Sequence, residues 1–100
     1  MSVTIIGRIK GDPEKIKQAF ANHAADMPVI SGTAKEMGAI SHRFLQGEGE
    51  LLILDEWDTA EHFQAFFSSQ EKIGQMMQEA GVAGPPQIEV YETVETAGDF

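Results

Sequence analysis

The amino-acid sequence predicts an α+β fold with a four-stranded antiparallel sheet, and three observations predict it. Stretches in which apolar and polar residues alternate, as in strands, are interspersed with stretches in which apolar residues recur every three or four positions, as in helices. They follow one another as strand, helix, strand, strand, helix, strand, which is the ferredoxin-like βαββαβ plan. The chain of 100 residues has the length of one domain, so we expect a single domain over residues 1–95 and a loose tail over residues 96–100.

The first half of this plan is a strand, a helix and a less regular piece. Residues 2–10 are rich in β-branched residues and read as a strand. One face of that strand carries Val3, Ile5, Gly7 and Ile9. Asp12, followed by a proline, is a helix N-cap, and the apolar stripe of the helix includes His23. Pro28 is expected to break or kink this helix, and residues 29–37 are expected to be turn-rich or helical.

The centre of the chain reads as a β-hairpin. Its strands are residues 39–46 and 51–57, joined by the loop GEG at 47–49. If this loop pairs Gln46 with Glu50, one face carries Ile40, His42, Phe44, Leu52, Leu54 and Glu56. The other face then carries Ser41, Arg43, Leu45, Leu51, Ile53, Asp55 and Trp57. A loop one residue longer or shorter would exchange these faces.

The second half repeats the helix and strand. Asp58, with Glu61 three residues later, is a capping-box start for one long helix. Its apolar stripe consists of Phe63, Phe66, Phe67, Ile73, Met76, Met77 and Ala80. The sequence GVAGPP at 81–86 is a loop, and residues 87–95 read as the last strand.

One face of the predicted sheet lacks cover. Right-handed crossovers place both helices on the same face, yet the hairpin strands carry large apolar residues on both faces. Two apolar faces and one layer of helices indicate a missing partner, and a second copy packing sheet on sheet is the simplest one. We therefore expect a homodimer.

Charge and composition exclude several classes of partner. Seven basic and sixteen acidic residues give a net charge of −9, which repels nucleic acid and anionic membrane surfaces. The chain has no cysteine, so disulfides, thiol nucleophiles and thiolate metal sites are excluded, and a reducing cytoplasm suits it. The N-terminal apolar run is too short for a signal peptide or a membrane span.

Two runs in the sequence carry a family resemblance. They are GAISHRF, which begins at Gly38, and LLILDEWDTAEHFQAFF, in which Asp55, one spacer and Trp57 precede a helix with Phe63, Phe66 and Phe67. The chain resembles the antibiotic-biosynthesis-monooxygenase-like family of dimeric α+β barrels. This resemblance implies a small pocket between sheet and helices in each subunit. Some members of the family are cofactor-free oxygenases of aromatic polyketides, and others degrade haem.

The resemblance does not extend to the haem-degrading branch. That branch uses an asparagine on the first strand and a tryptophan and a histidine on the second helix. The matching positions here are Gly7, Phe66 and Met76. Because no imidazole stands at the axial position, haem degradation is not expected. We expect no cofactor, and no metal either, because no histidine has a ligand-type partner at short spacing.

His42 is the main candidate for chemistry. With the pairing above it is a diagonal neighbour of Glu56, whose carboxylate would fix its tautomer for work as a general base. Cofactor-free oxygenation begins with removal of a proton from an electron-rich substrate, so a base is the group it requires. We expect His42 to line a cavity of a few hundred Å³. The alternative is an interfacial histidine bonded to the partner subunit.

Other candidates are substrate-binding residues. Arg43 and Asp55 would form a diagonal pair in which Arg43 anchors an anionic or carbonyl group, with Trp57 and Phe66 as aromatic walls. The alternative is a structural ion pair under a core tryptophan. His23 reaches toward the sheet or is an ordinary core histidine.

Two functions remain open at this point. The first is a cofactor-independent monooxygenase that acts on a small aromatic or polyketide-like molecule. The second is a non-catalytic homodimer that binds a hydrophobic metabolite or acts as a scaffold.

Overall fold

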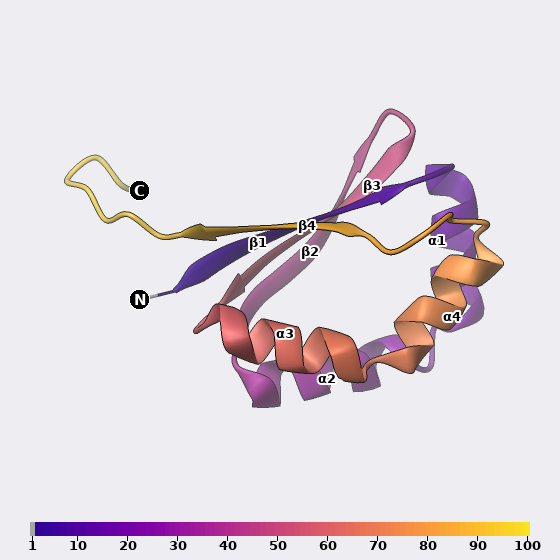
Figure 1. Ribbon diagram of the computed structural model, residues 1–100, viewed down its shortest axis with the longest axis horizontal. Coiled ribbons are helices and arrows are strands. Elements are labelled where there is room, and N and C mark those ends of the chain that lie inside the picture. Colours follow the sequence, from indigo (N-terminus) through magenta and orange to yellow (C-terminus); the bar gives the residue numbers. More distant parts are fainter. Residues whose placement is uncertain (1) are drawn as a thin grey trace.

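A computed structural model of the protein describes residues 2–100. Its strands are β1 (Val3–Lys10), β2 (Ala39–Gly47), β3 (Glu50–Trp57) and β4 (Gln87–Glu92). They form one antiparallel sheet in the order β2-β3-β1-β4. The helices are α1 (Pro13–Asn22), α2 (Met27–Met37), α3 (Ala60–Ser69) and α4 (Glu71–Glu79), and all four lie on one side of the sheet (Figure 1). The ferredoxin-like plan is confirmed. Within residues 2–100 no helix has the length and apolar character to cross a membrane.

The first helical segment differs from the prediction near its proline. Helix α1 ends at Asn22, with Asp12 capping its start by accepting from the Glu14 amide at 3.0 Å. A tight turn follows, and Pro28 lies in the first turn of α2 rather than breaking α1. Proline fits the first turn because no partner for its missing amide hydrogen is needed there. Residues 29–37 are helical, one of the two expected conformations.

The second helical segment is two helices rather than one. The N-cap of α3 is Thr59, whose hydroxyl accepts from the His62 amide at 3.1 Å, so the expected Asp58 cap is wrong. Helix α3 ends at Ser69, and a single residue, Gln70, separates it from α4. The Ser69 hydroxyl donates to the carbonyl of Phe66 at 2.7 Å, a bond that competes with continued helix.

The hairpin register is one residue away from the predicted register. Gly47 pairs with Glu50 across a two-residue turn, where the sequence suggested that Gln46 would do so. The shift exchanges the partners on both faces, so that His42 stands opposite Asp55 and Arg43 stands opposite Leu54. A second irregularity lies at Ile40, the extra residue between two paired neighbours, which makes a bulge at the start of β2.

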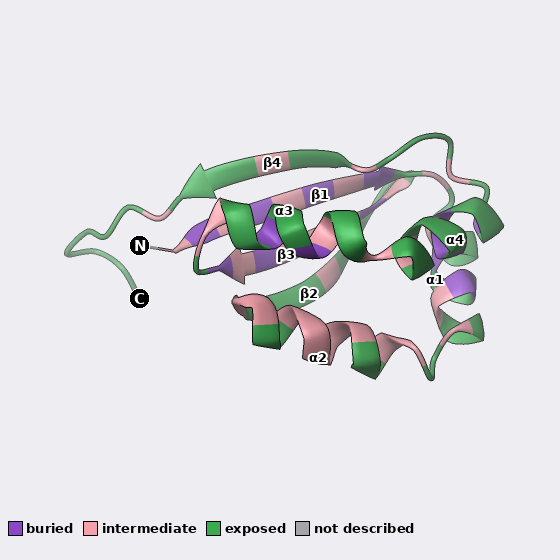
Figure 2. Ribbon diagram, turned by 60° about the horizontal axis from the view of Figure 1, so that its bottom comes forward, coloured by how far each residue is buried: buried purple, intermediate pink, exposed green. Residues whose placement is uncertain are grey.

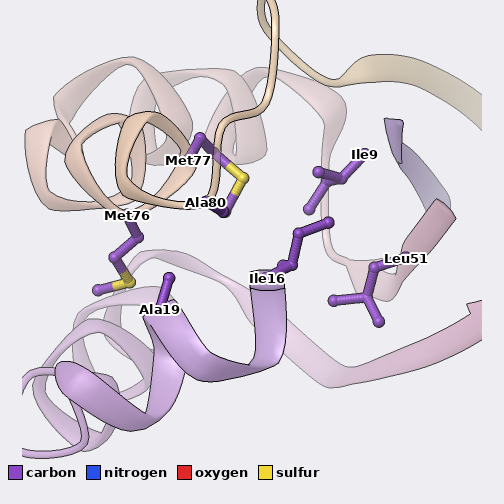
Figure 3. Close-up of a cluster of buried hydrophobic side chains, with 7 residues drawn as sticks. All are labelled: Ile9, Ile16, Ala19, Leu51, Met76, Met77 and Ala80. Atoms are coloured by element: carbon purple, nitrogen blue, oxygen red, sulfur yellow. The ribbon is translucent and has the colours of Figure 1, made fainter. Parts of the chain in front are cut away.

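The core lies between the sheet and the helices. The alternate residues Val3, Ile5, Gly7 and Ile9 share one face of β1, as predicted, and all four are buried. One buried cluster joins β1 and β3 to α1 and α4; Figure 3 shows Met76 and Met77 of α4 beside Ala19 and Ile16 of α1. A second cluster surrounds Trp57, which has no exposed surface.

The opposite face of the sheet has no helices over it. The register places Ile6, Leu52 and Leu54 there, all partly exposed, together with the exposed Leu45 and Tyr91. Both edge strands, β2 and β4, are largely exposed (Figure 2). The uncovered face therefore carries large apolar side chains, as expected, and the register places the charged residues Arg8, Arg43, Glu56 and Glu89 on it as well. Strand β4 ends at Glu92, three residues before the predicted end, and the remaining chain trails away from the sheet (Figure 1).

Candidate functional site

A cavity of about 280 Å³ lies between the sheet and the helices. Its walls are mostly apolar side chains from all four strands and all four helices, and Phe20, Phe44, Phe63, Phe66 and Phe67 supply aromatic rings. The polar or charged side chains in the lining belong to Ser31, Lys35, Ser41, His42 and Asp55. An apolar cavity with a few convergent polar groups is the usual form of a small-molecule site.

A histidine and a buried carboxylate meet in the wall of this cavity. His42 Nδ1 lies 2.6 Å from Asp55 Oδ1, and Trp57 Nε1 donates to Asp55 Oδ2 at 3.1 Å. Because a carboxylate only accepts, this contact places the ring hydrogen of His42 on Nδ1. No hydrogen bond within the described residues 2–100 occupies Nε2 of His42. That nitrogen is therefore free to take a proton.

Packing holds this group of three side chains in place. Asp55 is 6% exposed and Trp57 is fully buried, so the carboxylate cannot turn away without losing its bond to the indole. The indole packs against Phe63 and Phe66, at centroid separations of 5.6 and 5.4 Å. Phe44 also packs edge-to-face against the imidazole of His42, at a centroid separation of 4.8 Å. The geometry suits a general base whose orientation is set by a buried carboxylate.

The exposed part of the cavity lining lies mainly beside α2. Four of the five exposed lining residues, Lys35, Ile40, Ser41 and His42, come from α2 and from the neighbouring start of β2, and the fifth is Ile88 of β4. Helix α2 itself has no fully buried residue, and it is mostly of intermediate exposure in Figure 2. A ligand can therefore enter between α2 and β2 and meet His42 near the opening.

Two expected neighbour pairs are wrong because of the register. Arg43 and Glu56 lie on the uncovered face of the sheet and do not line the cavity. Glu56 accepts from the Ser2 hydroxyl at 2.6 Å instead of orienting His42. The expected ion pair of Arg43 with Asp55 is absent from residues 2–100, where the partners of Asp55 are His42 and Trp57.

The other candidates are distributed between the cavity and its surroundings. His42 lines a cavity of the expected size, and Phe66 is one of its walls. Trp57 lies behind Asp55 in the core rather than in the lining. Gly7, Phe66 and Met76, the three positions compared with the haem-degrading branch, all line the cavity.

His23 lies outside the cavity, at the junction of the helices. Helix α1 ends before it, so its ring turns toward α4, where Nε2 lies 2.8 Å from Glu79 Oε1 and Nδ1 lies 3.3 Å from Asp26. The hydrogen bonds to Glu79 and then Asp26 raise the pKa of His23 above its ordinary value. Lys72 also contacts Asp26, at 3.6 Å. His23 therefore joins helices and does not reach the sheet.

Sequence reasoning missed the polar residues at the opening. Ser31 and Lys35 are four residues apart on α2, so they share a face of the helix with the apolar lining residues Ile30 and Ala34. That spacing is the signal that could have found them. No three residues of the metal-ligating types His, Cys, Asp and Glu come together within residues 2–100.

Comparisons with known proteins agree on the fold. The family model described as antibiotic biosynthesis monooxygenase matches residues 2–78. The solved structure of SnoaB, a cofactor-independent oxygenase from Streptomyces nogalater, is 12% identical, covers 98% of both chains and superimposes with a TM-score of 0.62. A Nitrosomonas europaea protein of unknown function is 19% identical over 99% of this chain and 95% of its own, with a TM-score of 0.66.

A third structure extends the comparison. A conserved protein from Methanosarcina mazei is 16% identical over 94% of each chain, with a TM-score of 0.65. No curated protein sequence matches the chain. At these identities the likeness establishes the fold and leaves substrate and residue roles to be argued from the site.

Proposed function

The chain belongs to the antibiotic biosynthesis monooxygenase family, and we propose that it is a cofactor-independent monooxygenase of a small aromatic or polyketide-like molecule bound between sheet and helices. The observation that carries this proposal is the contact of His42 with buried Asp55 in the wall of an apolar cavity. This arrangement supplies a base whose free nitrogen can reach a bound molecule. The aromatic walls supply the surface on which a flat, electron-rich ring system packs.

The chemistry needs a base and molecular oxygen. His42 Nε2 removes a proton from an activated CH₂ group between two aromatic rings, which leaves a carbanion conjugated with the rings. This anion passes one electron to O₂, and the two radicals combine to form a carbon–oxygen bond in a peroxide. The O–O bond of the peroxide then breaks as the same carbon loses its second hydrogen as a proton, which leaves a carbonyl. The departing oxygen takes up this proton and the proton held by His42, and it leaves as water. One O₂ is consumed, and one of its atoms enters the product while the other leaves as water.

The protein contributes orientation and exclusion of water. Asp55 holds the hydrogen of the imidazole on Nδ1 and stabilises the positive charge that develops when Nε2 takes the proton. The apolar lining keeps the carbanion away from bulk water, so that reaction with O₂ competes with reprotonation.

Anthrones under oxygen provide the direct test. We expect the wild-type protein to accelerate both oxygen consumption and formation of the anthraquinone. His42→Gln should lower kcat by roughly 10²–10⁴-fold, the usual contribution of a general base. His62→Gln is the matched control, because His62 is an exposed histidine that does not line the cavity. Equal activity of His42→Gln and wild type would reject His42 as the base.

The apolar character of the lining also favours a second candidate function. A cavity with five polar or charged side chains among many apolar ones can bind a hydrophobic metabolite without changing it. Tight binding of an anthrone without any oxygen consumption by the wild-type protein would favour this function over the oxygenase.

The proposal includes a homodimer. Leu45, Leu52 and Leu54 lie on the uncovered face of the sheet, and a second copy stacked on that face would remove them from water. The small hydrophobic ligand and this second copy are the proposed partners. A cytoplasmic location is proposed because a cysteine-free chain is suited to a reducing compartment.

A further inference from the structure

Lys35 is a cation at the opening of the cavity without a carboxylate partner. Four of the seven basic side chains, Arg8, Lys10, Lys17 and Lys72, form ion pairs with carboxylates. Lys35 forms none within residues 2–100, although sixteen carboxylates are present in the chain. It is exposed and yet belongs to the cavity lining. An unpaired ammonium group beside an apolar cavity can bind a charge on the ligand.

A hydroxyl group beside Lys35 is also unoccupied. Ser31 lies one helical turn before Lys35 on α2, and it too lines the cavity. Thr33, on the same helix, donates its hydroxyl to the carbonyl of Val29 at 3.1 Å. No side-chain hydrogen bond of this kind engages Ser31 within the described part of the chain. Its hydroxyl hydrogen is therefore available to an acceptor on a ligand.

The cavity lining has no comparable group that could bind a positive charge on a ligand. Asp55 is the carboxylate of the lining, and its two oxygens are engaged by His42 and by the Trp57 indole. A cationic ligand would find no free carboxylate there. The protein as a whole carries a net charge of −9, which disfavours anions in general, so an anionic ligand requires a local cation.

We propose that the ligand of this cavity carries a carboxylate on its aromatic body, which Lys35 binds at the opening together with the hydroxyl group of Ser31. The inference rests on the proposed function, since it names the substrate class of the same site. The aromatic body lies against the apolar walls, and the anchored carboxylate fixes which carbon faces His42. Lys35 is thus a specificity-determining residue, and the base is a separate group.

Two matched probes test the inference by isothermal titration calorimetry without turnover. The probes are 3-hydroxy-2-naphthoate and 2-naphthol, which differ by the carboxylate. The wild-type protein should bind the carboxylate probe roughly three- to tenfold more tightly, the range for a charge-assisted contact at a partly exposed site. Lys35→Gln should abolish that preference and leave the affinity for 2-naphthol unchanged. The preference should also fall as NaCl is raised.

Lys15→Gln is the matched control. It removes the same charge from an exposed lysine of α1 that does not line the cavity, so it should leave both affinities unchanged. Equal wild-type affinities for the two probes would overturn the inference, as would equal effects of Lys35→Gln and Lys15→Gln. In either case the oxygenase proposal would stand, because it depends on the comparison of His42→Gln with wild type. Absence of binding by both probes would overturn the inference together with the ligand site itself.

Discussion

Oδ1 of Asp55 lies 2.6 Å from Nδ1 of His42, and this contact holds the imidazole in the tautomer that carries its hydrogen on Nδ1. The other oxygen of the same carboxylate is held by Trp57 at 3.1 Å. The carboxylate therefore links the buried core to the cavity, and its position is determined by the indole behind it. A change at Asp55 is expected to act through the imidazole.

Asp55→Asn should change the tautomer of the His42 imidazole while keeping the packing around position 55. An asparagine can accept from the Trp57 indole through its oxygen and donate to His42 Nδ1 through its amide, so the packing is kept while the ring hydrogen moves to Nε2. A base with its hydrogen on Nε2 cannot take a proton there, and we expect kcat for anthrone oxidation to fall by roughly 10²–10⁴-fold. ¹⁵N NMR of the imidazole should show the exchange of tautomers. An unchanged tautomer together with wild-type turnover would contradict the role assigned to Asp55.

Trp57→Ala should strongly destabilise the protein. The indole is fully buried, and it packs on Phe63 and Phe66. Truncation of a buried aromatic side chain costs about 3–5 kcal/mol in the free energy of unfolding, a large share of the stability of a small domain. Urea denaturation followed by circular dichroism measures this cost. Phe100→Ala, which removes an exposed ring from the tail, is the control and should change little. A loss below about 1 kcal/mol at Trp57 would show that the indole is not packed as described.

The sequence allowed prediction of the order of strands and helices along the chain and of the residues that share one face of β1, because alternation and turn signals are local properties. It did not determine the hairpin register. The letters GEG fit a loop of two or three residues equally well, and the difference of one residue decides which side chains face the helices. His42 was identified correctly as a cavity residue, but its partner was assigned as Glu56 rather than Asp55. The residue type of His42 indicated the site, but its partner Asp55 could be identified only from the register of the hairpin.

The positions at which the helices end could not be predicted from the sequence for a similar reason. Pro28 is compatible with both the end of one helix and the first turn of the next, and the tertiary context selects the second. The break also moves His23 out of the apolar stripe and into contact with Glu79 of α4. Long-range contacts of this kind have no signature in a single sequence.

Gly38→Ala should destabilise the junction of α2 and β2. Gly38 has a φ of 125°, which is unfavourable for any residue with a side chain, and an added Cβ would lie 2.7 Å from the Cγ atom of Asp58. We expect a loss of about 1–3 kcal/mol in the free energy of unfolding, measured by urea denaturation. Gly32→Ala is the matched control, because a Cβ there meets no atom within 4 Å. Equal stability of the Gly38 and Gly32 variants would contradict this account.

The contacts of His23 should make stability depend on pH. Glu79 and Asp26 raise the pKa of His23 above the ordinary value of 6.5, so the folded protein binds the proton more tightly than the unfolded chain. The stabilisation is therefore complete below pH 6.5 and is lost as the pH rises through the higher folded-state pKa. Lys72 also contacts Asp26, at 3.6 Å.

His23→Gln tests this dependence. Urea denaturation of wild type and variant should differ most near pH 6 and least near pH 8, and the variant should show the flatter profile. His62→Gln, which removes a histidine from an exposed position of α3, is the comparison variant. A difference between wild type and His23→Gln that stays constant with pH would assign the effect of His23 to packing alone.

Leu52→Glu should separate the proposed dimer into single chains. Leu52 lies on the face of the sheet that has no helices over it, between Arg8 of β1 and Leu45 of β2. In a dimer stacked on this face, a glutamate at position 52 would be removed from water against apolar side chains, which costs several kcal/mol. In the single chain the same side chain remains in contact with water and is tolerated. Light scattering coupled to size-exclusion chromatography should therefore give twice the chain mass for wild type and one chain mass for the variant at micromolar concentration.

Val29→Glu, on an exposed position of α2, introduces the same charge away from that face and should remain a dimer. A stable wild-type monomer under these conditions would mean that the exposed leucines have no partner copy, and the proposed dimer would then be rejected while the cavity and its His42–Asp55 contact, both formed within one chain, would remain.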